Sequence, residues 1–324
     1  MSVAYRSLLV TAWSLTTHLR RFWYAALFGG ILIGSGMGTA VFQVLGADPT
    51  NSVARVIAAP SSPLATLATL WAQARATGIG ATIALLAYGM LLCAALLALV
   101  WLAIHSVNVL VLATERRSRH TAIGATIHRD AESAFVPTLC IHLLTKAMTI
   151  IALIGWIRLL VHAALTTAVM TLWVILGFLG VVALLIITEI VTAFAIASIV
   201  LDGRPALAAL RDGGALLRRY GRVTLEHTFL FTAAHVGAAI VWVIGTILLA
   251  LPFIFLMSIG SAQHIAALPR LAVGIGIPVL IAYLAVVTMW FNTFLIAAWT
   301  LLYLRLTSAA EEPVPWLLRK SRGA

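Results

Sequence analysis

Six long apolar stretches constrain the fold of this chain more than any other feature. They cover residues 23–46, 79–112, 137–164, 169–201, 228–258 and 271–304. Each is longer than the ~20 residues with which a helix crosses a bilayer. Hydrophobic residues make up 62% of the chain and charged residues only 10%, which lies outside the range of soluble globular domains. The sequence therefore predicts an all-α fold, a polytopic membrane helical bundle with six transmembrane helices.

Little of the chain remains outside these stretches. Residues 1–324 are expected to form a single integral membrane domain, in which residues 305–324 are a short basic cytoplasmic tail. The first, third and fifth stretches each follow an amphipathic segment, at residues 3–21, 119–135 and 205–222. Segments of this kind can lie in the membrane interface and turn into the next span. We therefore expect three hairpins of transmembrane helices, each preceded by a cytoplasmic interfacial amphipathic helix.

The basic residues predict the orientation of these spans. Of the 21 Lys and Arg residues, 16 fall in four segments that share one side if every stretch crosses the membrane. The other side holds only Arg55, Arg75, Arg158 and Arg270, and Lys146 lies inside a stretch. Because positive charge is retained on the cytoplasmic side, both termini are expected in the cytoplasm. The expected location is the bacterial cytoplasmic (inner) membrane.

The net charge of +11 bears on the partners of the chain. It is spread over four segments next to the membrane instead of being gathered on one module, which argues against a nucleic-acid partner. The same segments attract anionic lipid headgroups at the cytoplasmic face. Membrane lipids are therefore the expected partners, and a protein partner in the membrane stays open.

Three glycines at four-residue spacing, Gly30, Gly34 and Gly38, lie in the first stretch. Such spacing removes the side chains from one helix face, so that a second helix can approach closely. A phosphate-binding loop would need a strand-to-helix turn and usually a lysine, and the sequence has neither there. We therefore expect helix packing, either within the chain or with a second copy, and favour packing within the chain.

Polar residues inside the stretches are the candidate functional site. Lys146 lies nine residues beyond Pro137, which is about 14 Å into the bilayer at 1.5 Å per residue. Glu189 lies 13 residues before Asp202, about 19 Å from the same face by that rise. Their stretches are consecutive and antiparallel, so the two charges can meet and neutralise each other. The full predicted polar layer is Lys146, Glu189, His142, His235, Asn292, His105 and Asn108.

Two interpretations of this layer remain open at the level of sequence. It binds an ion, a proton or a lipid headgroup, or it only forms hydrogen bonds between helices. Catalytic motifs such as HExxH and GxSxG are absent, as is an acidic cluster for a hard cation. Cys93 and Cys140 are isolated and are interpreted as packing residues. We therefore expect a non-enzymatic protein without catalytic, cofactor-binding or metal-binding residues and without a cofactor.

One segment carries a resemblance to known families. Residues 200–225, VLDGRPALAALRDGGALLRRYGRVTL, combine a Leu-Asp step, a proline-alanine-leucine helix and an arginine-rich entry into the next span. This pattern resembles the six-span bacterial glycerophosphodiester phosphodiesterase membrane-domain group and its uncharacterised relatives. The catalytic domain of that group is a separate soluble barrel, to which nothing here corresponds. The resemblance therefore implies a fold and no activity.

The same segment also looks like the cytoplasmic coupling loop of binding-protein-dependent importer permeases. Leu207 and Glu226 depart from it, because they stand where the loop has a glutamate and a proline. The function hypothesis is therefore a scaffold or assembly factor, or a handler of lipid or small solute. The alternative is a transmembrane permease subunit of an ATP-driven transporter. The residues that fit the loop's spacing are Ala208, Ala209, Gly213, Val223 and Leu225.

Overall fold

All regular secondary structure in the described part of the chain is helical. The computed structural model describes residues 3–32, 69–72, 75–76, 78–124, 126–163, 168–265 and 267–311. Five helices in these ranges are long and apolar enough to cross a membrane, in agreement with the all-α prediction. They are α6 (Ile79–Ser118), α8 (Phe135–Ala163), α9 (Ala168–Asp202), α10 (Ala206–Ala262) and α11 (Ala267–Glu311).

The first apolar stretch is described only at its beginning. The helix α1 (Val3–His18) leads through a short 3-10 turn, η1 (Arg20–Phe22), into α2 (Trp23–Leu32). The rest of the predicted span 23–46 lies outside the described residues, as do Gly34 and Gly38. The sixth span therefore remains a prediction.

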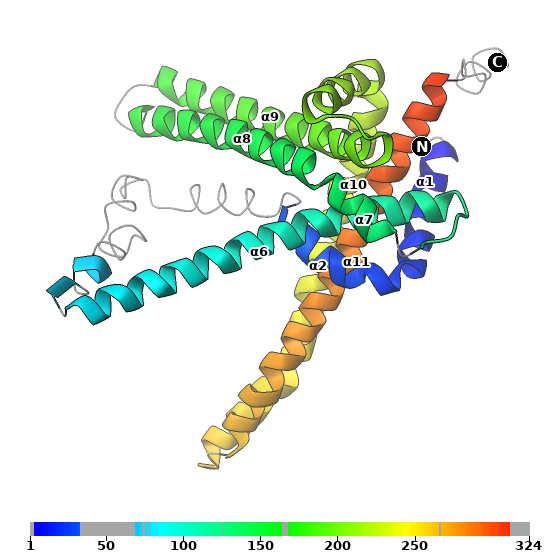
Figure 1. Ribbon diagram of the computed structural model, residues 1–324. Helices are drawn as coiled ribbons and strands as arrows, with labels where there is room; N and C mark the ends of the chain where they lie inside the picture. Colours follow the sequence, from blue (N-terminus) through cyan, green and yellow to red (C-terminus); the bar gives the residue numbers. More distant parts are fainter. Residues whose placement is uncertain are drawn as a thin grey trace.

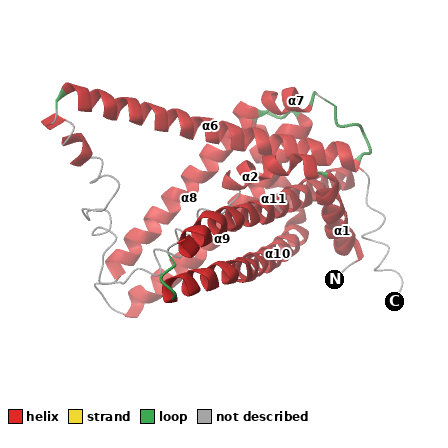
Figure 2. Ribbon diagram, turned by 90° about the horizontal axis from the view of Figure 1, so that it is seen from below, coloured by secondary structure: helices red, strands yellow, loops and turns green. Residues whose placement is uncertain are grey.

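The long helices extend from one common region in three directions. In Figure 1, α6 runs to the left, the α8–α9 pair to the upper left and the α10–α11 pair downwards. Figure 2, turned by 90°, again shows α6 and α8 diverging. Within two of these arms, α8 packs against α9 and α10 against α11. We call the common region the junction and the outward parts of the long helices the arms.

The junction contains most of the buried side chains. It comprises α1, α2, the short helix α7 (Ile127–Ser133) and the inner parts of the long helices, at residues 103–114, 134–149, 188–202, 209–231 and 293–306. Phe194 of α9 and Leu302 of α11 are almost completely buried, and they belong to one apolar cluster with α1. The arms instead expose many large apolar side chains. The fold is therefore held together at the junction.

The helix α1 shows why the N-terminal segment joins this core. Leu8, Ala12 and Leu15 recur at helical spacing and are 1%, 0% and 8% exposed. They lie in the same cluster as residues of α11, and α1 packs along α11 (Figure 1). The predicted interfacial segment at 3–21 is thus a helix that packs on the protein through its apolar face.

The other two predicted interfacial segments differ from each other. In residues 119–135 the helix α7 has only seven residues, so it is shorter than the predicted segment. In residues 205–222 the chain is helical from Ala206 and has a non-helical backbone at Tyr220, with φ −120° and ψ 26°. This kink separates a first segment from the long remainder of α10. A Cβ added at Gly213 would lie 2.9 Å from the Val191 carbonyl oxygen, so the first segment packs tightly on α9.

Gly30, the one glycine of the predicted triplet that the structure describes, lies where α2 packs against α11. A Cβ added there would lie 1.9 Å from Nδ2 of Asn292, so glycine at this position leaves room for the Asn292 side chain of α11. The Asn292 amide uses this space to donate a hydrogen bond to the Ala26 carbonyl at 3.1 Å. The partner helix at Gly30 thus belongs to the same chain, as we favoured.

Candidate functional site

A cavity at the edge of the junction collects polar side chains from the apolar helices. It has a volume of about 90 Å³ and lies between α6, α8, α9 and α11. Because a water molecule needs roughly 10–15 Å³ of such volume, the cavity has room for several waters or a small solute. Val107, Ile296 and Trp299 form part of its apolar wall. Its polar lining consists of His142, Thr145, Lys146, Thr149, Thr188, Glu189, Thr192 and Thr300.

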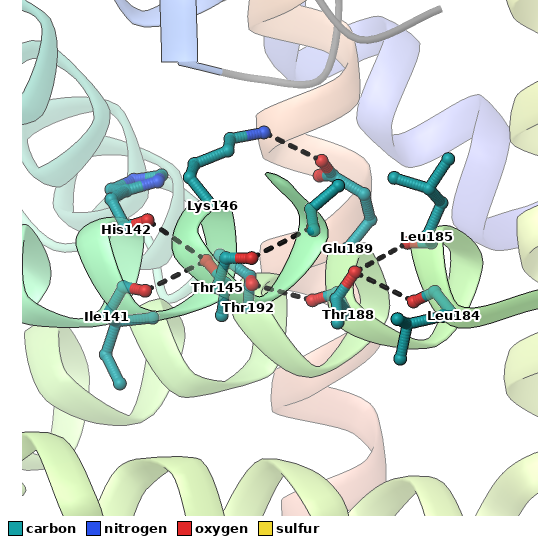
Figure 3. Close-up of polar contacts among 10 residues, drawn as sticks. Ile141, His142, Thr145, Lys146, Leu184, Leu185, Thr188, Glu189 and Thr192 are labelled. Atoms are coloured by element: carbon teal, nitrogen blue, oxygen red, sulfur yellow. Dashed lines mark hydrogen bonds and ion pairs between the residues drawn. The ribbon is translucent and has the colours of Figure 1, made fainter. Parts of the chain in front are cut away.

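The predicted contact between Lys146 and Glu189 is confirmed. Lys146 Nζ of α8 donates to Glu189 Oε1 of α9 at 3.0 Å (Figure 3). The two side chains are 32% and 43% exposed, so neither is sealed inside the protein. An ion pair in apolar surroundings relieves the cost of two isolated charges. The pair is therefore both internally neutral and open to the cavity.

His142 lies one turn before Lys146 on α8, and its ring lies beside the lysine in Figure 3. The side chain is only 5% exposed. Neither Nδ1 nor Nε2 has a hydrogen-bond partner among the described residues. A buried polar group left unpaired costs about 1–3 kcal/mol. The protein therefore carries an unfavourable group at the wall of this cavity.

The threonines of the cavity have one property in common. Each hydroxyl donates its proton to a carbonyl oxygen of its own helix, for example Thr145 to Ile141 and Thr192 to Thr188 (Figure 3). On α11, Thr300 likewise donates to the Ile296 carbonyl. The hydroxyl proton is then occupied, while the oxygen keeps its lone pairs as an acceptor. The walls beside Glu189 thus favour a ligand that donates hydrogen bonds.

These threonines were not predicted from the sequence, although the sequence carries a signal for them. Residues 145–149 read TKAMT and residues 188–192 read TEIVT. In both, a charged residue follows one threonine, and a second threonine comes four residues after the first. Residues four apart share one helix face, so the two segments place their threonines beside their charges. The repeated pattern on consecutive antiparallel helices indicates a polar site shared by both.

The structure does not bring all seven predicted polar residues together. Lys146, Glu189 and His142 line the cavity, and the other four contact different elements. Asn108 of α6 donates to the Ala131 carbonyl at 3.1 Å and accepts from Thr138 at 3.2 Å. These bonds tie α6 to α7 and to the start of α8. Asn108 therefore connects helices and does not belong to the cavity.

His105, His235 and Asn292 also have separate surroundings. Nε2 of His105 lies 3.2 Å from Nδ1 of His128, and the His105 ring stacks on Trp101. Nδ1 of His235 lies 3.0 Å from the Phe231 carbonyl oxygen within α10. Asn292 binds the backbone of α2, as described above. Polar residues at a similar depth in their helices therefore do not all belong to one site.

A second, more open hollow of about 250 Å³ lies beside η1 and α7. Arg21, Tyr24 and His128 provide its polar lining. The Arg21 guanidinium also lies over the Phe22 ring, 5.1 Å from the centroid. In the described ranges, no group of three or more His, Cys, Asp or Glu residues is placed to hold a metal ion.

Comparison with known proteins gives no match among protein-family models, curated proteins or solved structures. The resemblance of residues 200–225 to the six-span membrane-domain group therefore stays a prediction. The function must be inferred from the cavity itself and from the distribution of apolar and basic residues.

Proposed function

We propose that the chain is a six-span, non-enzymatic integral membrane protein that binds a small polar solute or a lipid headgroup between its helices. One observation carries this proposal: a cavity of about 90 Å³ contains an ion pair and a buried histidine that has no partner among the described residues. Ligand sites are concave, mostly apolar and furnished with a few convergent polar groups. The cavity has each of these properties.

The geometry favours binding over a purely structural role. A structural polar cluster is stabilising when every member is satisfied. Here His142 is 5% exposed and its ring nitrogens have no partner in the described part of the chain. Glu189 is 43% exposed, so its carboxylate can accept bonds beyond the one from Lys146. A ligand that occupies the cavity would supply the missing partners.

Mass spectrometry of the intact protein in mild detergent tests this proposal. The wild type should retain a small non-covalent adduct. The double variant Lys146→Met with Glu189→Gln should lose that adduct, since it removes both charges yet leaves no unpaired charge behind. An identical adduct pattern in the two proteins, or none in either, would count against a ligand in this cavity.

The membrane topology is part of the proposal. The five apolar helices and the uneven distribution of basic residues support six spans with cytoplasmic termini in the bacterial cytoplasmic membrane. Reporter domains fused after Arg117, Arg219 and Arg322 should all be cytoplasmic, and one fused near Ser61 should be external. An external reporter at Arg219 would contradict six spans, because an odd number of crossings would then precede it.

The ATP-driven permease subunit remains the alternative proposal. It requires the segment at 206–219 to offer its coupling residues to an ATPase. Two small residues that fit the coupling loop, Ala209 and Gly213, are buried, and Gly213 packs against the backbone of α9. Because these two residues pack inside the protein, they are not offered to an ATPase. The packing therefore favours the first proposal. Copurification with an ATPase would reverse that preference.

A further inference from the structure

We infer that the cavity between α6, α8, α9 and α11 takes a small zwitterion, a ligand that carries one ammonium group and one anionic group. This inference rests on the proposed function and specifies its ligand class. Two sources have this chemistry: a free amino acid with a small side chain, and the ethanolamine phosphate headgroup of a membrane lipid.

The charge balance of the cavity is the first argument. Lys146 and Glu189 contribute one charge of each sign and neutralise each other at 3.0 Å. A ligand with a single charge would engage one partner and leave the other without its counter-charge in apolar surroundings, which is costly. A zwitterion instead replaces one internal ion pair by two pairs with the ligand. The total charge in the cavity does not change.

The hydrogen-bonding groups supply the second argument, because they match the two ends of such a ligand. On the α9 side, Thr188 and Thr192 flank Glu189 and give their own protons to the helix backbone. Their oxygens, with the carboxylate, can accept from an ammonium group. On the α8 side, the Lys146 ammonium has three donors, and the neighbouring His142 ring can donate one more bond. These donors suit an anionic group.

The size of the cavity limits the ligand. At about 90 Å³ it admits a small molecule and excludes one with a long side chain. The apolar wall formed by Val107, Ile296 and Trp299 suits a short hydrocarbon body that joins the two charged groups of the ligand. This combination fits glycine, alanine or an ethanolamine phosphate group.

Thermal unfolding of the purified full-length protein with four probes of matched size tests the ligand class. The probes are glycine, acetate, methylammonium and acetamide at equal ionic strength. Glycine should raise the melting temperature with a saturable dose dependence, and the other three should not. If acetate or methylammonium alone stabilises as strongly, the zwitterion inference is overturned while solute binding stands. If no probe stabilises and no adduct is retained, the inference and the proposed function both fail.

Two further samples distinguish the source. The protein is placed in nanodiscs that contain phosphatidylglycerol with or without phosphatidylethanolamine. A lipid ligand should raise the melting temperature only with phosphatidylethanolamine, and should abolish the response to glycine. A free amino acid should stabilise equally in both nanodiscs. Stabilisation by neither phosphatidylethanolamine nor glycine would overturn the zwitterion in both forms.

A matched pair of threonines on α11 ties the effect to the cavity. Thr300 and Thr293 are 2% and 1% exposed, and each donates to the carbonyl four residues before it. Only Thr300 lines the cavity. Thr300→Val should weaken glycine or headgroup binding about 3- to 10-fold, the range expected for one lost hydrogen bond. Thr293→Val should leave binding unchanged, and equal effects of the two substitutions would place the ligand elsewhere.

Discussion

The two halves of α6 lie in different surroundings, although both contain large apolar side chains. Leu97 in the arm is 71% exposed, whereas Leu110 in the junction is completely buried, although one helix carries both. The most apolar part of this helix has none of its residues buried within the protein. In the proposed membrane, lipid covers the arm and protein covers the junction. An apolar sequence therefore does not by itself indicate protein contact.

What separates the two halves is their polar residues. Between residues 103 and 114, Ser106, Asn108 and Thr114 are all buried. Asn108 bonds to α7 and α8, while the outer half consists almost entirely of apolar residues. Polar residues that form hydrogen bonds between helices help to hold the helices together when the surrounding solvent is as apolar as the other side chains. The junction is therefore expected to account for most of the stability and the arms for membrane anchoring.

The largest expected difference comes from the same substitution in each half of α6. Leu110→Ala leaves a cavity in the junction and should lower the free energy of unfolding by roughly 2–5 kcal/mol. Leu97→Ala, in the arm, should change it by no more than about 0.5 kcal/mol. Thermal unfolding of both variants in one detergent provides the measurement. Equal losses would mean that the arm also packs against protein.

Glycines allow a second comparison of the two regions. Gly30→Ala places a methyl group 1.9 Å from Asn292 Nδ2, so the amide must move and give up its bond to Ala26. We expect a loss of roughly 1–3 kcal/mol, as for other overpacked sites. Gly89→Ala in the α6 arm meets nothing within 4 Å. It should stabilise the helix by up to about 1 kcal/mol through helix propensity.

The ion pair should show strong coupling in a double-mutant cycle. Lys146→Met or Glu189→Gln alone should destabilise by about 1–3 kcal/mol, below the roughly 3–5 kcal/mol of a fully buried pair. The reduction reflects the partial exposure of both side chains, at 32% and 43%. The double variant should recover most of the loss, because no charge then lacks a partner. Additive losses would show that the two side chains do not interact.

Substitution of His142 is expected to stabilise the protein. His142→Leu removes a buried imidazole whose nitrogens have no partner among the described residues. In the absence of ligand, this change should raise the free energy of unfolding by about 1 kcal/mol. The same variant should bind the solute less tightly. A destabilised His142→Leu protein would show that the ring contributes to packing and not to a ligand site.

The depth of a residue along its helix could be predicted from the sequence. The direction in which its side chain points around the helix axis could not. Lys146 and Glu189 were paired correctly because their depths could be counted from the ends of two antiparallel stretches. His105 and Asn108 have a similar depth, yet both contact α7, and Asn108 also contacts the start of α8. Depth follows from the rise per residue, whereas the direction of a side chain depends on how the helices pack. The divergence of the arms likewise has no signature in the sequence.

The central claim is that Lys146 and Glu189 serve a ligand and are dispensable for the fold. The most direct test is the double variant Lys146→Met with Glu189→Gln, measured for its melting temperature with and without glycine or phosphatidylethanolamine. Our account predicts a protein that is nearly as stable as the unliganded wild type and no longer stabilised by either compound. A double variant that still responds to one of them as the wild type does would contradict the claim.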